Sequence, residues 1–509
     1  MVETRLPAEL LRDDPRIPKT PDPSAIVIFG ASGDLTARKL VPALYELAAQ
    51  RRLPMEFAVI GVARTPMSHD RFREKLRRSL EEQRPGGVSD DIWDSFSGGI
   101  FYLAGDSKKA ETYRELNDLL KKLDGERGTR GNRSFYLASS PTLFSTIVEG
   151  LGEAGMNKGE DGGWARLVVE KPFGWDLSSA RELNADIRRY FRETQTYRID
   201  HYLGKETVQN ILALRFSNSI FEPLWSQHYV DHVQITVAED LGIGGRGGFY
   251  EDAGALRDII QNHAMQILCL TAMEPPAAFD AESVREEKVK VLKAARRIPE
   301  DEVEDFAVRG QYARGWVWGE EVQGYREEVD VAPDSTTETY VALRLFIDNW
   351  RWAGVPFYVR TGKRLPKRVT EIAIQFKPTP HAPFAGAENL EPNVLVVRVQ
   401  PEEGVSLKIG AKVPGSGFEI RSVNMDLFYG TAFLEQVPDA YQRLLLDLML
   451  GDPTLFIRSD ETEGAWDILD PVMRAWTENG EIALYPAGTW GPDEAEKLLG
   501  RAGRRWRRP

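Results

Sequence analysis

The chain has 509 residues, 42% of them hydrophobic and 28% charged, which predicts a soluble globular protein of two or three domains. Its formal net charge is −13, and no concentrated basic stripe precedes the last few residues, so nucleic acid and an anionic membrane are poor candidates for the main partner. The single cysteine, Cys269, excludes an intrachain disulfide and a cysteine-built metal site, and its apolar neighbours indicate a buried structural thiol.

Residues 1–24 are charged and proline-rich and lack the apolar stretch of a signal peptide. No later run approaches the length of a membrane span. We therefore expect a cytoplasmic protein whose residues 1–24 form a disordered N-terminal segment.

Strand-like and helix-like segments alternate over residues 25–200. The run AIVIF at 25–29 is typical of a buried parallel strand, and the turn GASGDL at 30–35 leads into a helical run that Pro42 should kink or interrupt. The alternation continues through further strands as far as Asp200, which predicts a Rossmann-like domain, a doubly wound parallel sheet, over 25–200.

Two features indicate that this domain binds a dinucleotide. Gly30 and Gly33 occupy the second and third glycine positions of the pattern G-x-G-x-x-G, whereas Ile28 stands at the first, so the motif alone is weak. Arg64 ends the second strand, where NAD-binding units carry an acid. An arginine there suits a 2′-phosphate and favours NADP over NAD; the alternative is a solvated loop arginine.

After residue 200 the regular alternation of strand-like and helix-like segments ends. A long helix is expected over residues 255–273, strands that alternate like those of an antiparallel sheet lie between 338 and 430, and a helical region spans about 440–469. Residues 201–509 therefore read as an α+β domain with a large, mostly antiparallel sheet. We expect the basic tail GRAGRRWRRP, residues 500–509, to be solvated and frayed.

The segment RIDHYLGKE at 198–206 gathers an acid, an imidazole, a phenol and an ammonium, namely Asp200, His201, Tyr202 and Lys205. A helix should begin at Glu206, and a lysine beside the free N–H groups of a helix start suits a phosphate. The alternative is a surface loop before an ordinary helix.

His263 lies within an apolar stripe of the long helix, which fits either a satisfied core histidine or a general base. Asp200 is a candidate to orient the imidazole, and Asp258 to bind sugar hydroxyls. Lys363 and Arg368 belong to a basic run, GKRLPKR, that would enclose a phosphate together with His201 and Lys205, or else form a solvated loop.

The segments GASGDL, EKPFG, RIDHYLGKE, GRGGFYEDAGALRDIIQNH and GVPFYVRTGKRL together resemble the glucose-6-phosphate dehydrogenase family, over residues 24 to about 500. The resemblance implies that glucose 6-phosphate is oxidised at C1 to 6-phosphoglucono-1,5-lactone with hydride transfer to NADP, the first step of the oxidative pentose phosphate pathway. It also implies that residues 201–509 serve substrate binding and dimerisation, in a homodimer or homotetramer joined through the antiparallel sheet.

Roles for matching positions follow from the resemblance. The catalytic residues would be His263 as base, Asp200 as its carboxylate partner, and Lys171 between sugar and nicotinamide. The substrate would be bound at the phosphate and the hydroxyls by His201, Tyr202, Lys205, Lys363, Arg368, Glu239, Asp258 and Gln400. NADP would be bound by Gly30, Ala31, Ser32, Gly33, Asp34, Leu35, Arg64, Pro141, Glu170 and Lys171. No metal is expected.

Two stretches depart from the family pattern. Ser139, Ser140 and Pro141 stand where many members read LPP, which leaves the cofactor contacts of that loop open. Trp490 stands where eukaryotic members with a second, structural NADP carry an arginine, so we expect no second NADP site. Another phosphorylated aldose as substrate, and a non-catalytic NADP-binding regulator, are the alternative functions.

Overall fold

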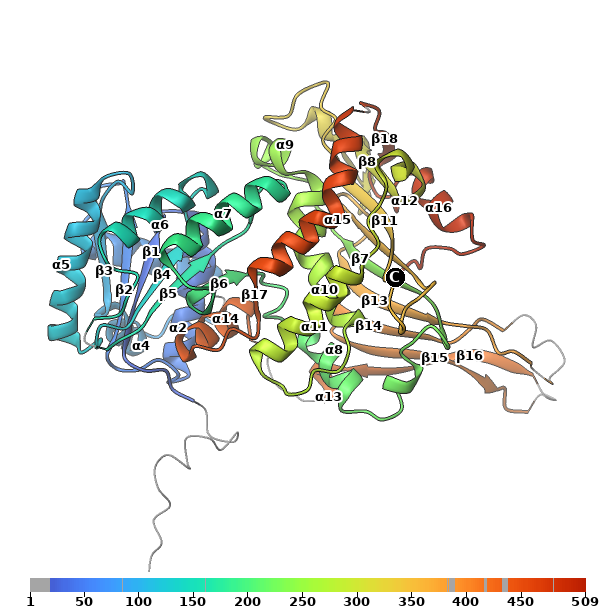
Figure 1. Cartoon of the computed structure of the whole chain (residues 1–509), viewed down its shortest axis with the longest axis horizontal. Helices are drawn as coiled ribbons and strands as arrows, with labels where there is room; N and C mark the ends of the chain where they lie inside the picture. Colours follow the sequence, from blue (N-terminus) through green and yellow to red (C-terminus); the bar gives the residue numbers. More distant parts are fainter. Residues whose placement is uncertain are drawn as a thin grey trace, which may run out of the picture. The chain divides into compact units, whose positions relative to one another are not determined.

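The computed structural model describes residues 19–84, 86–160, 162–381, 383, 390–415, 419–432, 438–478 and 480–509. The chain forms two compact units (Figure 1). The first unit comprises the chain up to Gly174 with Arg181–Gly204 and Pro438–Ser459, and the second comprises Trp175–Ala180, Lys205–Val437 and Asp460–Pro509.

A seven-stranded sheet forms the core of the first unit, in the order β17-β6-β5-β4-β1-β2-β3. Its strands are β1 (Ser24–Phe29), β2 (Phe57–Ala63), β3 (Ile100–Ala104), β4 (Arg133–Leu137), β5 (Ala165–Val169), β6 (Thr196–Ile199) and β17 (Phe456–Ile457). All neighbours are parallel except β17 and β6. The order 3-2-1-4-5-6 is that of a doubly wound dinucleotide-binding sheet, which confirms the predicted fold class of this region.

Helices connect these strands: α2 (Val41–Ala49), α3 (His69–Gln83), α4 (Asp90–Ser97), α5 (Ala110–Arg127), α6 (Phe144–Glu153) and α7 (Leu177–Tyr190). A π-helical turn, η1 (Thr36–Leu40), precedes α2, and Pro42 lies in the first turn of α2. Proline has no N–H to donate to the carbonyl four residues earlier, so the change of helix type falls where the interruption was predicted.

The first unit differs from the prediction at its borders. The helical region expected to close the second domain begins with α14 (Ala440–Leu450), which instead packs on α2, and β17 pairs with β6. These partners are far apart in the sequence, so no local pattern indicates them. Of the segment 1–24 expected to be disordered, residues 1–18 lie outside the described residues, whereas Pro21 is buried and Ser24 begins β1.

A nine-stranded sheet organises the second unit, in the order β16-β15-β14-β13-β7-β12-β11-β8-β18. Its strands are β7 (Val230–Ala238), β8 (Ala307–Ala313), β11 (Tyr340–Phe346), β12 (Pro356–Gly362), β13 (Val369–Phe376), β14 (Val394–Gln400), β15 (Gly404–Lys412), β16 (Ile420–Phe428) and β18 (Ala483–Pro486). Only the pairs β12–β7 and β18–β8 are parallel, which confirms the large, mostly antiparallel sheet. A small ribbon, β9 (Gly315–Val317) and β10 (Glu320–Val322), stands apart from it.

The helices of the second unit are α8 (Glu206–Phe216), α9 (Gly247–Ala255), α10 (Met265–Ala272), α11 (Ala281–Ala294), α12 (Val303–Phe306), α13 (Tyr429–Ala432), α15 (Ser459–Glu478) and α16 (Asp493–Gly500), with the first residue of α15 counted in the first unit. Helices α8 and α11 both pack on α10 (Figure 1). The long helix expected over residues 255–273 is in fact a π-helix, η5 (Leu256–Ala264), followed by α10. Gly254, with φ +63°, interrupts the helical geometry inside α9, two residues before η5 begins.

The C-terminal tail is solvated only in part: residues 500–503, 505 and 508 are exposed as predicted, whereas Trp506 is not. Trp506 is 5% exposed and donates its indole N–H to the Ala495 carbonyl at 2.8 Å. Arg504 pairs with Asp231 at 2.8 Å, and Arg507 with Glu371 at 2.9 Å. The composition of the tail could not predict this, because the carboxylates that accept from Arg504 and Arg507 lie on the sheet, 273 and 136 residues away in the sequence.

Candidate active site

In the first unit the predicted cofactor residues gather at one edge of the sheet. Gly30 follows β1, Arg64 follows β2, residues 139–141 follow β4, Glu170 and Lys171 follow β5, and Asp200 follows β6. Because these strands are parallel, their carboxyl ends share that edge, which is where ligands bind in doubly wound sheets.

Gly30 makes the turn out of β1 possible. Its φ is +84°, and a Cβ atom there would lie 2.5 Å from the Ala138 carbonyl oxygen. Its N–H donates to the Val62 carbonyl, and its own carbonyl accepts from the Gly33 N–H, each at 2.9 Å. A side chain at position 30 would therefore push the β1 turn away from the end of β4.

The helical run after this turn starts without a side-chain cap. The run is helical from Asp34, and no side chain accepts from the first N–H groups of η1, which continues it from Thr36; by contrast, Ser68 caps α3 and Asp439 caps α14. Uncapped N–H groups at a helix start, preceded by a glycine turn, fit the pyrophosphate of a dinucleotide.

Arg64 is exposed directly after β2. Its guanidinium makes no hydrogen bond or ion pair with any residue that the structure describes, so it is available to a phosphate. This fits a 2′-phosphate, and a solvated arginine equally well, so its role stays a prediction.

Glu170 is buried between two phenols. Tyr136 donates to its Oε1 at 2.5 Å, and Tyr441 donates to the same atom at 3.3 Å. Burial raises the pKa of the Glu170 carboxyl and that of Tyr136. These contacts fix the backbone from which Lys171 projects.

Asp200 is 1% exposed at the end of β6. Its Oδ1 accepts from the Tyr202 N–H at 2.9 Å, and its carbonyl accepts from the Leu203 N–H at 3.0 Å. The His201 ring is stacked on Tyr441, with centroids 6.2 Å apart and 10° between the planes. The short loop thus holds an acid and an imidazole in defined orientations.

The second unit contains a cationic cluster around Gln400. Lys205 Nζ donates to Gln400 Oε1 at 2.5 Å, and Arg368 Nη2 approaches the same oxygen at 3.5 Å. Gln400 Nε2 in turn donates to Thr370 Oγ1 at 3.1 Å. Lys205 is also the residue before α8, whose start has no side-chain cap. Two cations beside a helix start without a side-chain cap fit an anion, and the phosphate role of this cluster stays a prediction.

A second cluster surrounds Lys363, which is buried. Its ammonium donates to Glu239 Oε2, lies 4.0 Å from Asp258 Oδ2, and lies 5.3 Å from the centroid of the Tyr250 ring. Lys363 was expected beside the phosphate. Here it holds the two carboxylates expected to bind sugar hydroxyls, and its phosphate role stays a prediction.

His263 is 1% exposed within η5. Its backbone N–H donates to Asn262 Oδ1 at 2.7 Å, and Asn262 Nδ2 donates to the Arg257 carbonyl at 3.0 Å. Buried Glu338 accepts from the Leu256 N–H at 3.0 Å and anchors the start of the same helix. π-Helical turns are frequent at functional sites. The expected pairing of Asp200 with His263 stays a prediction.

Sequence reasoning missed several supporting residues. Tyr136 and Tyr441 hold Glu170, Tyr250 faces Lys363, and Glu338 anchors η5. None lies in a segment whose local pattern indicates the contact; a buried phenol beside a carboxylate is visible only in three dimensions.

The 3-2-1-4-5-6 parallel sheet with its glycine turn is typical of dinucleotide-dependent oxidoreductases. The second unit adds a cluster of cations around Gln400 and a buried histidine in a π-helix. The model of the family "Glucose-6-phosphate dehydrogenase, NAD binding domain" matches residues 27–210, and that of "Glucose-6-phosphate dehydrogenase, C-terminal domain" matches residues 212–507. The chain belongs to the glucose-6-phosphate dehydrogenase family.

Relatives are similar in sequence to this chain over nearly its whole length. The chain is 49% identical over 503 residues to glucose-6-phosphate 1-dehydrogenase 2 of Mycobacterium tuberculosis (98% of each chain). It is 51% identical over 484 residues to glucose-6-phosphate 1-dehydrogenase of Aggregatibacter actinomycetemcomitans (95% of this chain, 97% of the relative). A solved glucose-6-phosphate dehydrogenase in complex with glucose-6-phosphate has a TM-score of 0.88 at 37% identity (96% of this chain, 99% of that one).

Across the part of the chain that the structure describes, no helix combines the length and the apolar character that crossing a bilayer requires.

Proposed function

We propose that this protein oxidises glucose 6-phosphate at C1 to 6-phosphoglucono-1,5-lactone with hydride transfer to NADP, the first step of the oxidative pentose phosphate pathway. One observation carries the proposal: the similarity to curated glucose-6-phosphate 1-dehydrogenases covers 98% of the chain and an equal share of the relative. A non-catalytic regulator that kept only the fold would have no need for an acid, a lysine and a histidine together at the three proposed catalytic positions.

The 6-phosphate binds at the cationic cluster. Lys205 and Arg368 supply charge-assisted hydrogen bonds, and the free N–H groups at the start of α8 add the positive end of the helix. His201 and Tyr202 complete the phosphate site in this proposal.

The sugar hydroxyls bind at the carboxylates. Glu239 and Asp258 accept hydrogen bonds from the hydroxyls, and Lys363 between them offsets their mutual repulsion. Gln400, placed by Thr370, contributes a donor or an acceptor as the sugar requires.

His263 removes the proton from the anomeric hydroxyl. Asp200 fixes the imidazole tautomer and stabilises the charged ring, and Lys171 lies between sugar and nicotinamide. Residues 30–35, Arg64, Pro141 and Glu170 hold NADP, which when bound accepts the hydride from C1. The protein's own contribution is orientation and a base.

The exchange His263→Asn tests the assignment of the base. We expect kcat to fall by about 10²–10⁴-fold with little change in the KM for glucose 6-phosphate, because a general base acts in the transition state. The matched control is His228→Asn, since His228 is an exposed histidine of the same unit. Unchanged kcat in the His263 variant would remove it from the mechanism.

We also propose that the enzyme is a homodimer or homotetramer joined through the large sheet. On β16, Val423, Met425 and Leu427 are 43%, 59% and 48% exposed and lie on one face. Their partners on β15 are Ile409, Leu407 and Val405. An edge strand with an exposed apolar face is typical of an interaction surface.

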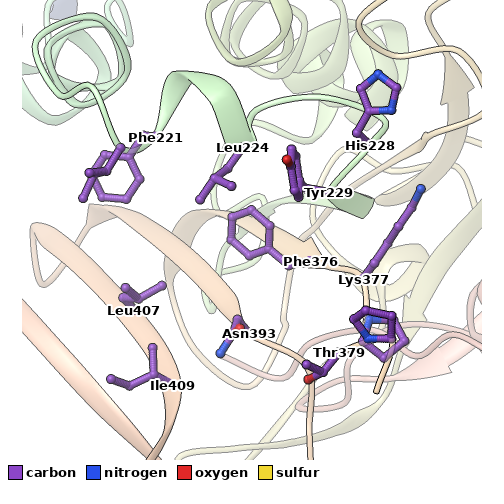
Figure 2. A pocket seen from close by; sticks show the side chains of 13 residues that line it. Phe221, Leu224, His228, Tyr229, Phe376, Lys377, Thr379, Asn393, Leu407 and Ile409 are labelled. Atoms are coloured by element: carbon purple, nitrogen blue, oxygen red, sulfur yellow. The ribbon is translucent and has the colours of Figure 1, made fainter. Parts of the chain in front are cut away.

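A cavity of about 540 Å³ continues this apolar face. Figure 2 shows Leu407 and Ile409 lining it together with Phe221, Leu224, Tyr229 and Phe376. The exposed row on β16 and this cavity together supply the apolar core that a stable interface needs. A cytoplasmic location belongs to the same proposal, in keeping with one buried, unpaired cysteine among the described residues.

A further inference from the structure

A second cavity, of about 770 Å³, lies in the first unit. Its lining includes Trp164 and Ala165 at the start of β5, and Thr194 and Gln195 just before β6. It therefore lies at the amino ends of these parallel strands, whereas the predicted cofactor residues lie at the carboxyl ends. The two locations are separated by the length of the strands, so this cavity is not part of the cofactor site.

Cations dominate its charge. Lys158, Arg166 and Arg192 line the cavity, and none of its described lining residues carries a carboxylate. In a chain of net charge −13, three cations around one cavity without an acid mark a place where an anion is favoured.

Arg166 is held in place before any ligand arrives. Its Nη1 donates to the carbonyls of Leu448 and Met449 at 2.6 and 2.8 Å, near the end of α14. A Cβ atom on Gly451, whose φ is +80°, would lie 2.4 Å from Nη2, so a side chain at position 451 would displace the guanidinium from this place. Within the described residues both hydrogen bonds leave from Nη1, and Nε and Nη2 remain for a ligand. Burial lowers the pKa of Arg166, a cost that an anion beside it would offset.

The cavity also has an aromatic wall. The Arg166 guanidinium lies 3.6 Å from the centroid of the Trp164 ring, which creates a planar surface beside the cations. The wall is braced: Gln195 Nε2 donates to the carbonyls of Asn157 and Ala165, each at 3.0 Å, and Asn157 Nδ2 donates to that of Tyr190 at 2.6 Å. A planar ring stacks on such a surface.

We propose that this cavity binds a nucleotide, with its phosphates held by Lys158, Arg166 and Arg192 and its base stacked at Trp164. The volume lies in the range of small-ligand sites. Arginine and lysine supply charge-assisted hydrogen bonds to phosphate. The planar surface at Trp164 favours a ligand that also carries an aromatic ring, as a nucleotide does. The site is separate from the NADP site and does not depend on the proposed reaction.

Isothermal titration with ATP tests the proposal. We expect wild type to bind one ATP per chain in the presence of saturating NADP, because NADP occupies the cofactor site and leaves this cavity open. The double variant Lys158→Glu/Arg192→Glu should bind ATP at least about tenfold more weakly, because two charge-assisted contacts become repulsive. Its turnover without ATP should equal that of wild type, which shows that it is folded.

The matched control is Arg78→Glu/Lys122→Glu, the same change of charge at exposed cations of α3 and α5. It should bind ATP like wild type. Equal weakening in this control, or equal ATP affinity in wild type and in Lys158→Glu/Arg192→Glu, would overturn the proposal. Inorganic tripolyphosphate should bind more weakly than ATP; equal binding would overturn the nucleotide assignment, since the base would contribute nothing.

Discussion

At the scale of single residues, we predict that Arg64 sets which nicotinamide cofactor is favoured. It is exposed at the end of β2, where an acid would take a ribose 2′-hydroxyl. Arg64→Ala should raise the KM for NADP far more than the KM for NAD, because only NADP carries the 2′-phosphate. Initial rates with both cofactors measure this; an equal rise for both would refute the 2′-phosphate role.

Residues close together in the sequence were the predictable part of the site. Asp200, His201, Tyr202 and Lys205 share one short segment, so their grouping followed from spacing. The contact of Lys205 with Gln400 crosses 195 residues, and that of Glu170 with Tyr441 crosses 271. Such contacts depend on how strands are ordered in a sheet, which hydrophobic periodicity does not specify.

At the scale of secondary-structure elements, the C-terminal tail anchors the large sheet. The buried Arg360 guanidinium lies 4.5 Å from the Trp506 ring centroid and 4.9 Å from that of Trp490, and its Nη2 donates to the Arg507 carbonyl at 2.5 Å. Trp506 belongs to the apolar core of the second unit. The tail thus covers a buried cation that would otherwise meet solvent on one side.

Trp506→Ala should lower the free energy of unfolding by roughly 3–5 kcal/mol, as for other large aromatic side chains removed from a core. Chemical denaturation followed by circular dichroism measures the change. The control is Arg508→Ala in the same tail, whose ion pair with Glu496 is long, at 3.7 Å, and exposed, and which should change stability by less than about 0.5 kcal/mol. Equal stability of the Trp506 variant and wild type would contradict the packing of the tail and support the solvated tail expected from its composition.

Elements also show where sequence patterns succeed. The parallel sheet was predictable because each strand is a short apolar run separated by a helix-length segment, as in AIVIF and FAVIGVA. The long helix around His263 was predictable as a helix but not as a π-helix. Its geometry depends on Gly254 and on Glu338. Glu338 lies 82 residues beyond Leu256, the first residue of that helix.

At the scale of the whole molecule, the second unit presents an apolar face that a monomer would leave in water. Met425→Glu should shift wild-type dimers or tetramers toward monomers, since a carboxylate at the centre of an apolar interface is left without a partner. Sedimentation equilibrium at micromolar concentration measures the shift. Asn424→Glu, on the opposite face of β16, should leave the assembly intact. A monomeric wild type would contradict the interface.

The central claim is the reaction itself, and absorbance at the NADPH wavelength tests it most directly. Purified protein is mixed with glucose 6-phosphate and, in parallel, NADP or NAD, with an epimeric sugar phosphate as the specificity control. We expect rapid reduction of NADP with glucose 6-phosphate and slower reduction with the epimer. Absence of reduction with either cofactor, in folded protein that still binds NADP, would contradict the dehydrogenase and favour a non-catalytic regulator.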